Sequence, residues 1–336
     1  MWRNSKKSLF IVLAAIMLVA TACGSNQAPA SSGASNGETG ELRKVVLRLK
    51  WIHQAQFAGY YTAVEKGFYK EAGLDVEIRP GGADFPSVQM IASGSEHFGV
   101  TGADQILMAR EKGVPVQALS AVYRKTPFVL FSLKDSGITK MEDLIGKKVG
   151  VKLGGNEELT YRAMVNSAGI EASKIEEMPV KYDMSPLLSG QVAAWPGYVI
   201  NEMLAVQEQG HEVNVIQPGD YDINFYADTL FTTESIIKND PEMVKSFVQA
   251  SMKGWEYAIA NPEEAAEFGL KYGSKLNLEH EIGMMKASVE LLEPANLPLG
   301  KMDTAAWSEL QKSLIDLKFL KEEQNLEDVF TNEFIE

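Results

Sequence analysis

Cysteine is almost absent from this sequence, because Cys23 is the only one among 336 residues. A chain with one cysteine forms no internal disulfide and no multi-cysteine metal site. The four histidines are far apart, and His280-Glu281 lacks the second histidine of a zinc-protease motif. A G-x-S-x-G nucleophile elbow and a Walker phosphate loop are also missing. We therefore expect no metal, no cofactor and no enzymatic activity, although scattered carboxylates or histidines sometimes build an active site.

Positive charge is also scarce, since 32 Lys and Arg residues stand against 45 Asp and Glu residues. Loss of residues 1–22 would remove three of these basic residues and no acidic one, so the excess of acidic residues would increase. A chain this acidic is not expected to bind nucleic acid.

An apolar run of membrane-spanning length is missing as well. The apolar run at 9–20 is shorter than the roughly 20 residues that a membrane helix needs. It follows Arg3, Lys6 and Lys7 and precedes small residues. This arrangement predicts a cleaved signal peptide over residues 1–22.

Cys23 directly follows these small residues and resembles the lipidated cysteine of a bacterial lipobox. Ala20 departs from the leucine usual at that motif position, and the alternative is an ordinary signal peptide with an incidental cysteine. Residues 23–41 are rich in Ser, Gly, Ala and Asn, which predicts a flexible tether. We expect an extracytoplasmic protein that is lipid-anchored to the cell membrane through Cys23.

The stretch 47–79 has the pattern of a strand, a turn, a helix and a second strand. Apolar residues alternate in both strand segments and recur at three- and four-residue steps over 57–68 between them. Such a unit predicts a right-handed crossover and a parallel sheet. The helix has no Ser, Thr, Asp or Asn cap at 53–56, so its first N–H groups are expected to meet a ligand, Gln54 or water.

Strands and helices continue to alternate along the chain, which predicts the α/β fold class. An apolar strand at 126–132 leads into a second α/β region, and an extended aromatic segment at 222–233 returns from it. Residues 195–198 are expected to form a turn. Helices are then expected at 241–260, 262–272, 279–292 and 304–317. Two α/β lobes joined by two crossings predict a cleft of the kind found in hinged binding proteins.

The strand-to-helix turns are rich in aromatic and amide side chains. The candidates to stack on a flat ring are Trp51, Tyr60, Trp195, Tyr198 and Tyr226. The candidates to hydrogen-bond its edge are His53, Gln54, Gln56, Asn156, Asn201 and Glu202. Each of these side chains could instead have a purely structural role. Trp51, at the end of a strand, is equally expected to be a residue of the hydrophobic core.

Three segments resemble the extracytoplasmic substrate-binding proteins of ABC importers, in the branch related to thiamin-pyrimidine synthases and sulfonate or taurine binders. They are KWIHQAQFAGYYTAVEKGFYKEAGLDVEI, GVTGADQILMAREKGVPV and YADTLFTTESIIKNDPEMVKSFVQASMKGW. The resemblance implies a type II periplasmic-binding-protein fold, with one lobe of residues 42–128 plus 226–336 and another of 129–225. It also implies a monomer that captures a small ligand by lobe closure and delivers it to the permease and ATPase subunits of an importer.

The segment around Gly197-Tyr198 and Asn201-Glu202 is similar to the branch that binds formylaminopyrimidine, a thiamin precursor. A riboflavin-binding branch has similar QAQFAGYY turns, and alkanesulfonate or taurine binding is a further alternative. The ligand contacts implied by the resemblance are Trp51, Gln56, Tyr60, Gly155, Asn156, Tyr198 and Glu202. Glu202 would suit an aminopyrimidine, because a carboxylate accepts hydrogen bonds from an amino group.

Two other classes of function compete with transport. Pyrimidine synthases have the same fold, but they carry a cysteine-rich iron motif that is missing here, and their pyridoxal-phosphate lysine is not assignable. A signalling module that presents its ligand to a sensor kinase is the third alternative.

Overall fold

The computed structural model describes residues 41–82, 84–181, 183–292 and 297–335. These belong to one compact unit, Gly40–Glu336. The predicted signal peptide, the lipidation site Cys23 and all but the last residue of the predicted tether lie outside the described residues. Within the described ranges, no helix is both long and apolar enough to cross a membrane.

A five-stranded sheet has the order β2-β1-β3-β10-β4. Its strands are β1 (Arg43–Arg48), β2 (Leu74–Arg79), β3 (Phe98–Thr101), β4 (Val116–Tyr123) and β10 (Asp228–Thr233). The predicted parallel pairing of the first two strands is confirmed, and β3 is also parallel to β1. However, β10 lies antiparallel between β3 and β4, so the sheet is mixed.

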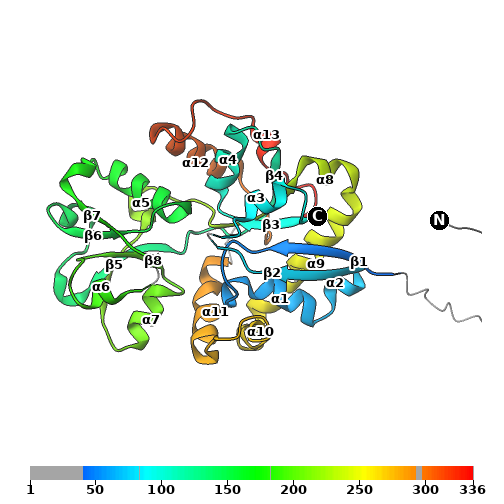
Figure 1. Cartoon of the computed structure of the whole chain (residues 1–336), viewed down its shortest axis with the longest axis horizontal. Helices are drawn as coiled ribbons and strands as arrows, with labels where there is room; N and C mark the ends of the chain where they lie inside the picture. The colour runs from blue at the N-terminus through cyan, green and yellow to red at the C-terminus, as the bar shows by residue number, and fades with distance from the viewer. Residues whose placement is uncertain (1–40, 83, 182, 293–296, 336) are drawn as a thin grey trace, which may run out of the picture. The chain divides into compact units, whose positions relative to one another are not determined.

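A second group of strands comes from the middle of the chain (Figure 1). In a three-stranded sheet, β5 (Phe128–Leu133) is antiparallel to β8 (Trp195–Tyr198) and β9 (Val213–Ile216). A parallel pair consists of β6 (Lys148–Val151) and β7 (Glu176–Pro179). The predicted turn at 195–198 is wrong, because these residues form an edge strand, where a proline is tolerated.

The chain passes twice between the five-stranded and the three-stranded sheet. The first passage lies between β4 and β5 and the second between β9 and β10, near the two predicted crossings. The predicted extended segment at 222–233 is too long, because β10 begins only at Asp228.

The predicted helix at 57–68 is divided into shorter pieces. It consists of a 3₁₀ turn η1 (Ala55–Phe57), α1 (Ala58–Glu65) and α2 (Phe68–Glu71). Gly67 separates α1 from α2 with a left-handed φ of 81°, which glycine adopts at little cost.

The remaining helices include the four that the sequence analysis expects at 241–260, 262–272, 279–292 and 304–317, although the second of these ends at Gly269. In full, the remaining helices are α3 (Ser87–Ala92), α4 (Ala103–Glu111), α5 (Gly155–Ser167), α6 (Ser185–Leu188), α7 (Glu202–Glu208), α8 (Glu234–Asn239), α9 (Pro241–Ala260), α10 (Pro262–Gly269), α11 (Leu278–Leu292), α12 (Thr304–Asp316) and α13 (Leu326–Val329).

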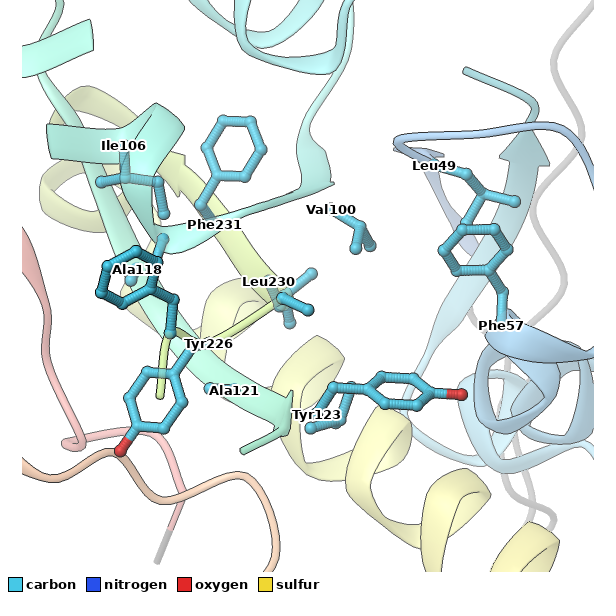
Figure 2. Packing of buried hydrophobic residues seen from close by; sticks show 14 of the residues in the cluster. Leu49, Phe57, Val100, Ile106, Ala118, Ala121, Tyr123, Tyr226, Leu230 and Phe231 are labelled. Carbon is cyan, nitrogen blue, oxygen red and sulfur yellow. The ribbon is translucent and has the colours of Figure 1, made fainter. Parts of the chain in front are cut away.

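Helices α1 and α9 pack closely because glycines lie at their contact. A methyl group on Gly254 of α9 would lie 2.2 Å from the carbonyl oxygen of Gly59 in α1. The apolar core extends from these helices into the five-stranded sheet. Figure 2 shows part of it, in which Val100 comes from β3 and Leu230 and Phe231 come from β10. This packing holds the ends of the strands that carry the site.

Candidate functional site

A cavity of about 830 Å³ lies where strand ends and helix starts meet. Its walls come from the segments after β1, β2, β3, β6, β7 and β8, together with the starts of α3, α4, α5 and α7. The carboxyl ends of parallel strands are the usual ligand crevice of α/β sheets. Among the described residues of its wall, Trp51 and Tyr198 are the two aromatic ones.

The structure brings six of the seven predicted contacts together in this wall. They are Trp51, Gln56, Gly155, Asn156, Tyr198 and Glu202. Contact of these six residues with a ligand stays a prediction.

Tyr60 does not lie in the wall of the cavity. Its side chain is fully buried, and its ring packs edge-on against Trp255 of α9 at a centroid distance of 5.5 Å. The neighbouring Tyr61 points elsewhere, because its ring stacks on Tyr272. Helical periodicity alone did not show that both tyrosines are core residues.

Lys50, which the sequence analysis did not select, connects the elements of the site. Its Nζ donates to the Tyr198 hydroxyl at 2.9 Å and lies 2.8 Å from Oδ1 of Asp228. It also donates to the Ala227 carbonyl at 2.8 Å. Burial by itself lowers the pKa of Lys50, but the Asp228 carboxylate and its neighbours outweigh that effect and raise it. Lys50 is therefore a fixed ammonium that joins the end of β1 to β8 and the start of β10.

Amide side chains continue from this ion pair. Gln56 Nε2 donates to Oδ2 of Asp228 at 2.7 Å, and Gln54 Nε2 donates to Oε1 of Gln56 at 2.6 Å. The Tyr198 hydroxyl donates to Oδ1 of Asn156 at 3.0 Å. These bonds fix the side chains before any ligand arrives, which lowers the entropy cost of binding.

The side-chain amide nitrogen of Asn156 is not part of these hydrogen bonds. This nitrogen, Nδ2, is buried and has no hydrogen-bond partner in the described part of the chain. A buried donor without a partner is costly, so this nitrogen is suited to a ligand acceptor or to a bound water.

A second charged group lies around Lys152. Its Nζ is 2.6 Å from Oε1 of Glu202 and 3.8 Å from Oε1 of Glu157. The same ammonium lies 5.8 Å from the centre of the Trp51 ring, within the range of a cation–π contact. The other oxygen of Glu202 accepts from the Tyr198 backbone N–H at 2.9 Å. Glu202 is thus held by two donors, with lone pairs remaining for further hydrogen bonds.

The helix start near Ala55 has an acceptor that neither a ligand, Gln54 nor water supplies. The Ala55 N–H donates to the carboxylate of Glu281, which lies in α11 and is 3% exposed. Burial raises the pKa of Glu281, while the bond from Ala55 lowers it. A partner 226 residues away leaves no local sign in the sequence.

Asp104 is another buried carboxyl that the sequence analysis did not select. It lies at the start of α4, where burial raises its pKa from 3.8 to about 6. Its Oδ2 accepts from Gln105 Nε2 at 2.6 Å, and its Oδ1 has no partner among the described residues. A methyl group on Gly102 would lie 2.3 Å from this Oδ1 and 3.0 Å from Cβ of Asn156. The starts of α4 and α5 therefore meet closely beside the cavity.

The cavity wall holds hydrogen-bonding and aromatic groups rather than a cluster of metal ligands. In the described ranges, no three or more His, Cys, Asp or Glu side chains lie together as a metal site would require. The wall thus offers aromatic, amide and charged groups for contact with a small molecule.

Comparison with known proteins gives the following relatives. A family model described as NMT1/THI5 like matches residues 54–265. The riboflavin-binding protein RibY of Chloroflexus aurantiacus is 26% identical, over 95% of this chain and 95% of its own length. The formylaminopyrimidine-binding protein of Halalkalibacterium halodurans is 27% identical, over 87% of this chain and 90% of its own. A 4-amino-5-hydroxymethyl-2-methylpyrimidine phosphate synthase also matches, at 23% identity.

Among solved structures, the periplasmic aliphatic sulphonate binding protein SsuA from Escherichia coli has a TM-score of 0.68 and 13% sequence identity. The match covers 85% of this chain and 91% of that one. The predicted periplasmic-binding-protein fold is confirmed.

Proposed function

The chain belongs to the NMT1/THI5-like family, and on this basis we propose that it is the extracytoplasmic substrate-binding component of an ABC importer. Its ligand is a small heteroaromatic vitamin or vitamin precursor. The observation that carries this proposal is the cavity wall, in which Trp51 and Tyr198 accompany amides already fixed by hydrogen bonds. Capture proceeds by closure of the predicted lobes, 42–128 plus 226–336 and 129–225.

Within the site, the aromatic rings of Trp51 and Tyr198 stack on the ligand ring. Asn156 Nδ2 donates to a ring nitrogen or a carbonyl oxygen, and Glu202 accepts from an amino group. Formylaminopyrimidine has such an amino group, and a relative is named for binding it. Riboflavin is the second candidate, because another relative of nearly full coverage is named for it.

An alkanesulfonate fits the site less well. The two least exposed lysines of the wall already have carboxylate partners, Lys50 with Asp228 and Lys152 with Glu202. A sulfonate would have to displace one of these carboxylates or bind beside it, which costs electrostatic energy.

The same wall gives no assignment for a catalytic step, so we propose a binding protein rather than a synthase. Incubation of the purified protein with pyridoxal phosphate and iron should yield no pyrimidine product. Product formation would establish the enzyme alternative.

Membrane attachment through Cys23 and delivery to permease and ATPase subunits complete the proposal. The mature chain acts as a monomer tethered by residues 23–41. Metabolic labelling with a fatty acid should mark the parent chain and not Cys23→Ser. A pull-down should recover the permease, whereas recovery of a sensor kinase would support signalling.

Ligand binding is tested by titration calorimetry and tryptophan fluorescence with pyrimidines, flavins and sulfonates. Trp51 is the tryptophan of the wall, so Trp51→Phe should lose most of the ligand-induced fluorescence change. The double variant of Trp51 and Tyr198 to Ala should weaken binding by about 100-fold, from roughly 1.5 kcal/mol for each ring. Tyr198→Phe keeps the ring and removes the hydroxyl that bonds to Lys50 and Asn156, so it separates the effect of the ring from the effect of these two bonds. Binding of sulfonates alone, or unchanged affinity in the double variant, would contradict the proposal.

A further inference from the structure

The cavity extends well beyond the residues that bind the ligand ring in the proposal above. Its wall follows α4 along its whole length, from Gly102 just before the helix to Lys112 and Val114 just after it. A helical rise of 1.5 Å per residue gives about 15 Å between Gly102 and Lys112. Asn156 lies at the Gly102 end, because its Cβ is 3.0 Å from a methyl group placed on Gly102. The cavity therefore has an inner end at Asn156 and a second part that runs away from it.

We call this second part the outer limb. It lies along α4 and the start of α3, and its wall includes Val88, Gln89, Gln105, Met108, Lys112 and Val114. Val88, Met108 and Val114 are partly buried and pack against the core, so they give the limb apolar sides. The two glutamines and Lys112 add hydrogen-bonding groups, of which Gln89 and Lys112 are solvent-exposed.

The volume of the cavity indicates what kind of ligand group the outer limb can hold. Pockets for drug-sized ligands measure about 300–1,000 Å³, and about 830 Å³ is near the upper end of that range. A single pyrimidine ring at the inner end would leave the space along α4 to water. Apolar sides with scattered amides suit a chain whose CH groups pack and whose hydroxyls hydrogen-bond.

We infer that the outer limb is a subsite for a polar chain of several atoms, polyol-like in chemistry, that extends from the ring held at the inner end. This inference rests on the proposed function and, of its two candidate ligands, favours riboflavin, whose flat ring carries such a chain, over formylaminopyrimidine. The polyol-like chain of the ligand lies along α4 and ends near Lys112.

The experiment measures binding of three probes to the mature chain by titration calorimetry. Lumichrome is a three-ring compound without a chain, riboflavin has a related ring system with a polyol chain, and formylaminopyrimidine has one ring. The parent should bind riboflavin at least about tenfold more tightly than lumichrome.

Two variants then fill the limb. Met108→Trp puts a larger side chain into it, and Gln89→Trp does the same from an exposed position where folding is less sensitive. Both should lower riboflavin affinity about tenfold and change lumichrome affinity by less than about threefold. Gln207→Trp on α7 is the control, because Gln207 is exposed and does not line the cavity.

The outcomes separate the two proposals. Equal binding of riboflavin and lumichrome, or an affinity ratio unchanged in both filled variants, overturns the subsite while the proposed function stands. Formylaminopyrimidine binding most tightly, and being insensitive to both variants, has the same consequence. Failure of the parent to bind any of the three probes overturns the proposed function and the subsite with it.

Discussion

Replacement of Lys50 by Met would test whether the buried ion pair organises the site. The Lys50 side chain is 14% exposed and its partner Asp228 is 1% exposed, so the variant leaves a buried carboxylate without its cation. Gln56 remains as a donor to that carboxylate, while the bonds of Lys50 to Tyr198 and Ala227 are lost.

Breaking a buried ion pair from one side typically costs about 3–5 kcal/mol. We expect a loss near 3 kcal/mol for Lys50→Met, because the partial exposure of Lys50 lets water reach the remaining charge. Urea unfolding followed by circular dichroism measures this loss.

A double-mutant cycle isolates the pair. Asp228→Asn in the Lys50→Met background removes the stranded charge, so part of the lost stability should return and the coupling energy should exceed about 1 kcal/mol. Ligand affinity should fall in Lys50→Met, because Tyr198 loses the bond that positions it. A stability loss below about 1 kcal/mol together with additive effects would refute the role given to this pair.

Three further variants test the packing and the buried carboxyls. Gly254→Ala should destabilise the protein by about 2–3 kcal/mol despite alanine's higher helix propensity, since its methyl group would meet the α1 backbone at 2.2 Å. Gly269→Ala, whose methyl group finds its nearest neighbour at 3.5 Å, should be tolerated in the same thermal unfolding assay. Glu281→Ala should cost about 1–3 kcal/mol in urea unfolding because it strands the first amide of η1, whereas exposed Glu279→Ala should cost little. Because burial raises the pKa of Asp104 from 3.8 to about 6, the folded state holds this proton more tightly and the parent loses stability as pH rises through that interval. Asp104→Asn should therefore gain about 3 kcal/mol relative to the parent between pH 3.5 and pH 7, and a pH-independent difference would contradict the burial argument.

Much of the secondary structure follows from local pattern. The helix at 241–260 has the bounds that the sequence predicts. The helix follows Asp240, whose side chain accepts from the Met243 N–H, and it starts with a proline. Alternation, capping residues and proline act over a few residues, so the sequence displays them directly.

Part of the candidate site was also predictable, for a different reason. Six predicted contacts line one cavity, although they follow β1, β6 and β8, which belong to three different sheets. Each contact lies at or just after the carboxyl end of its strand, where α/β proteins usually bind ligands. Gly155 and Asn156 open α5, as expected for a strand-to-helix turn, whereas Tyr198 ends a strand where the sequence analysis expected a turn.

The sequence by itself determined the α/β class, most of the elements at these strand ends and the acidic character of the chain. Only the tertiary structure decided that Tyr60 faces the core, that Glu281 meets Ala55 and that Lys50 pairs with Asp228. It also inserted β10 antiparallel into a sheet that begins parallel. These features depend on which groups, far apart in the sequence, are buried together on folding. Hydrophobic periodicity shows that a face of an element is buried, but it does not show which segment packs against that face.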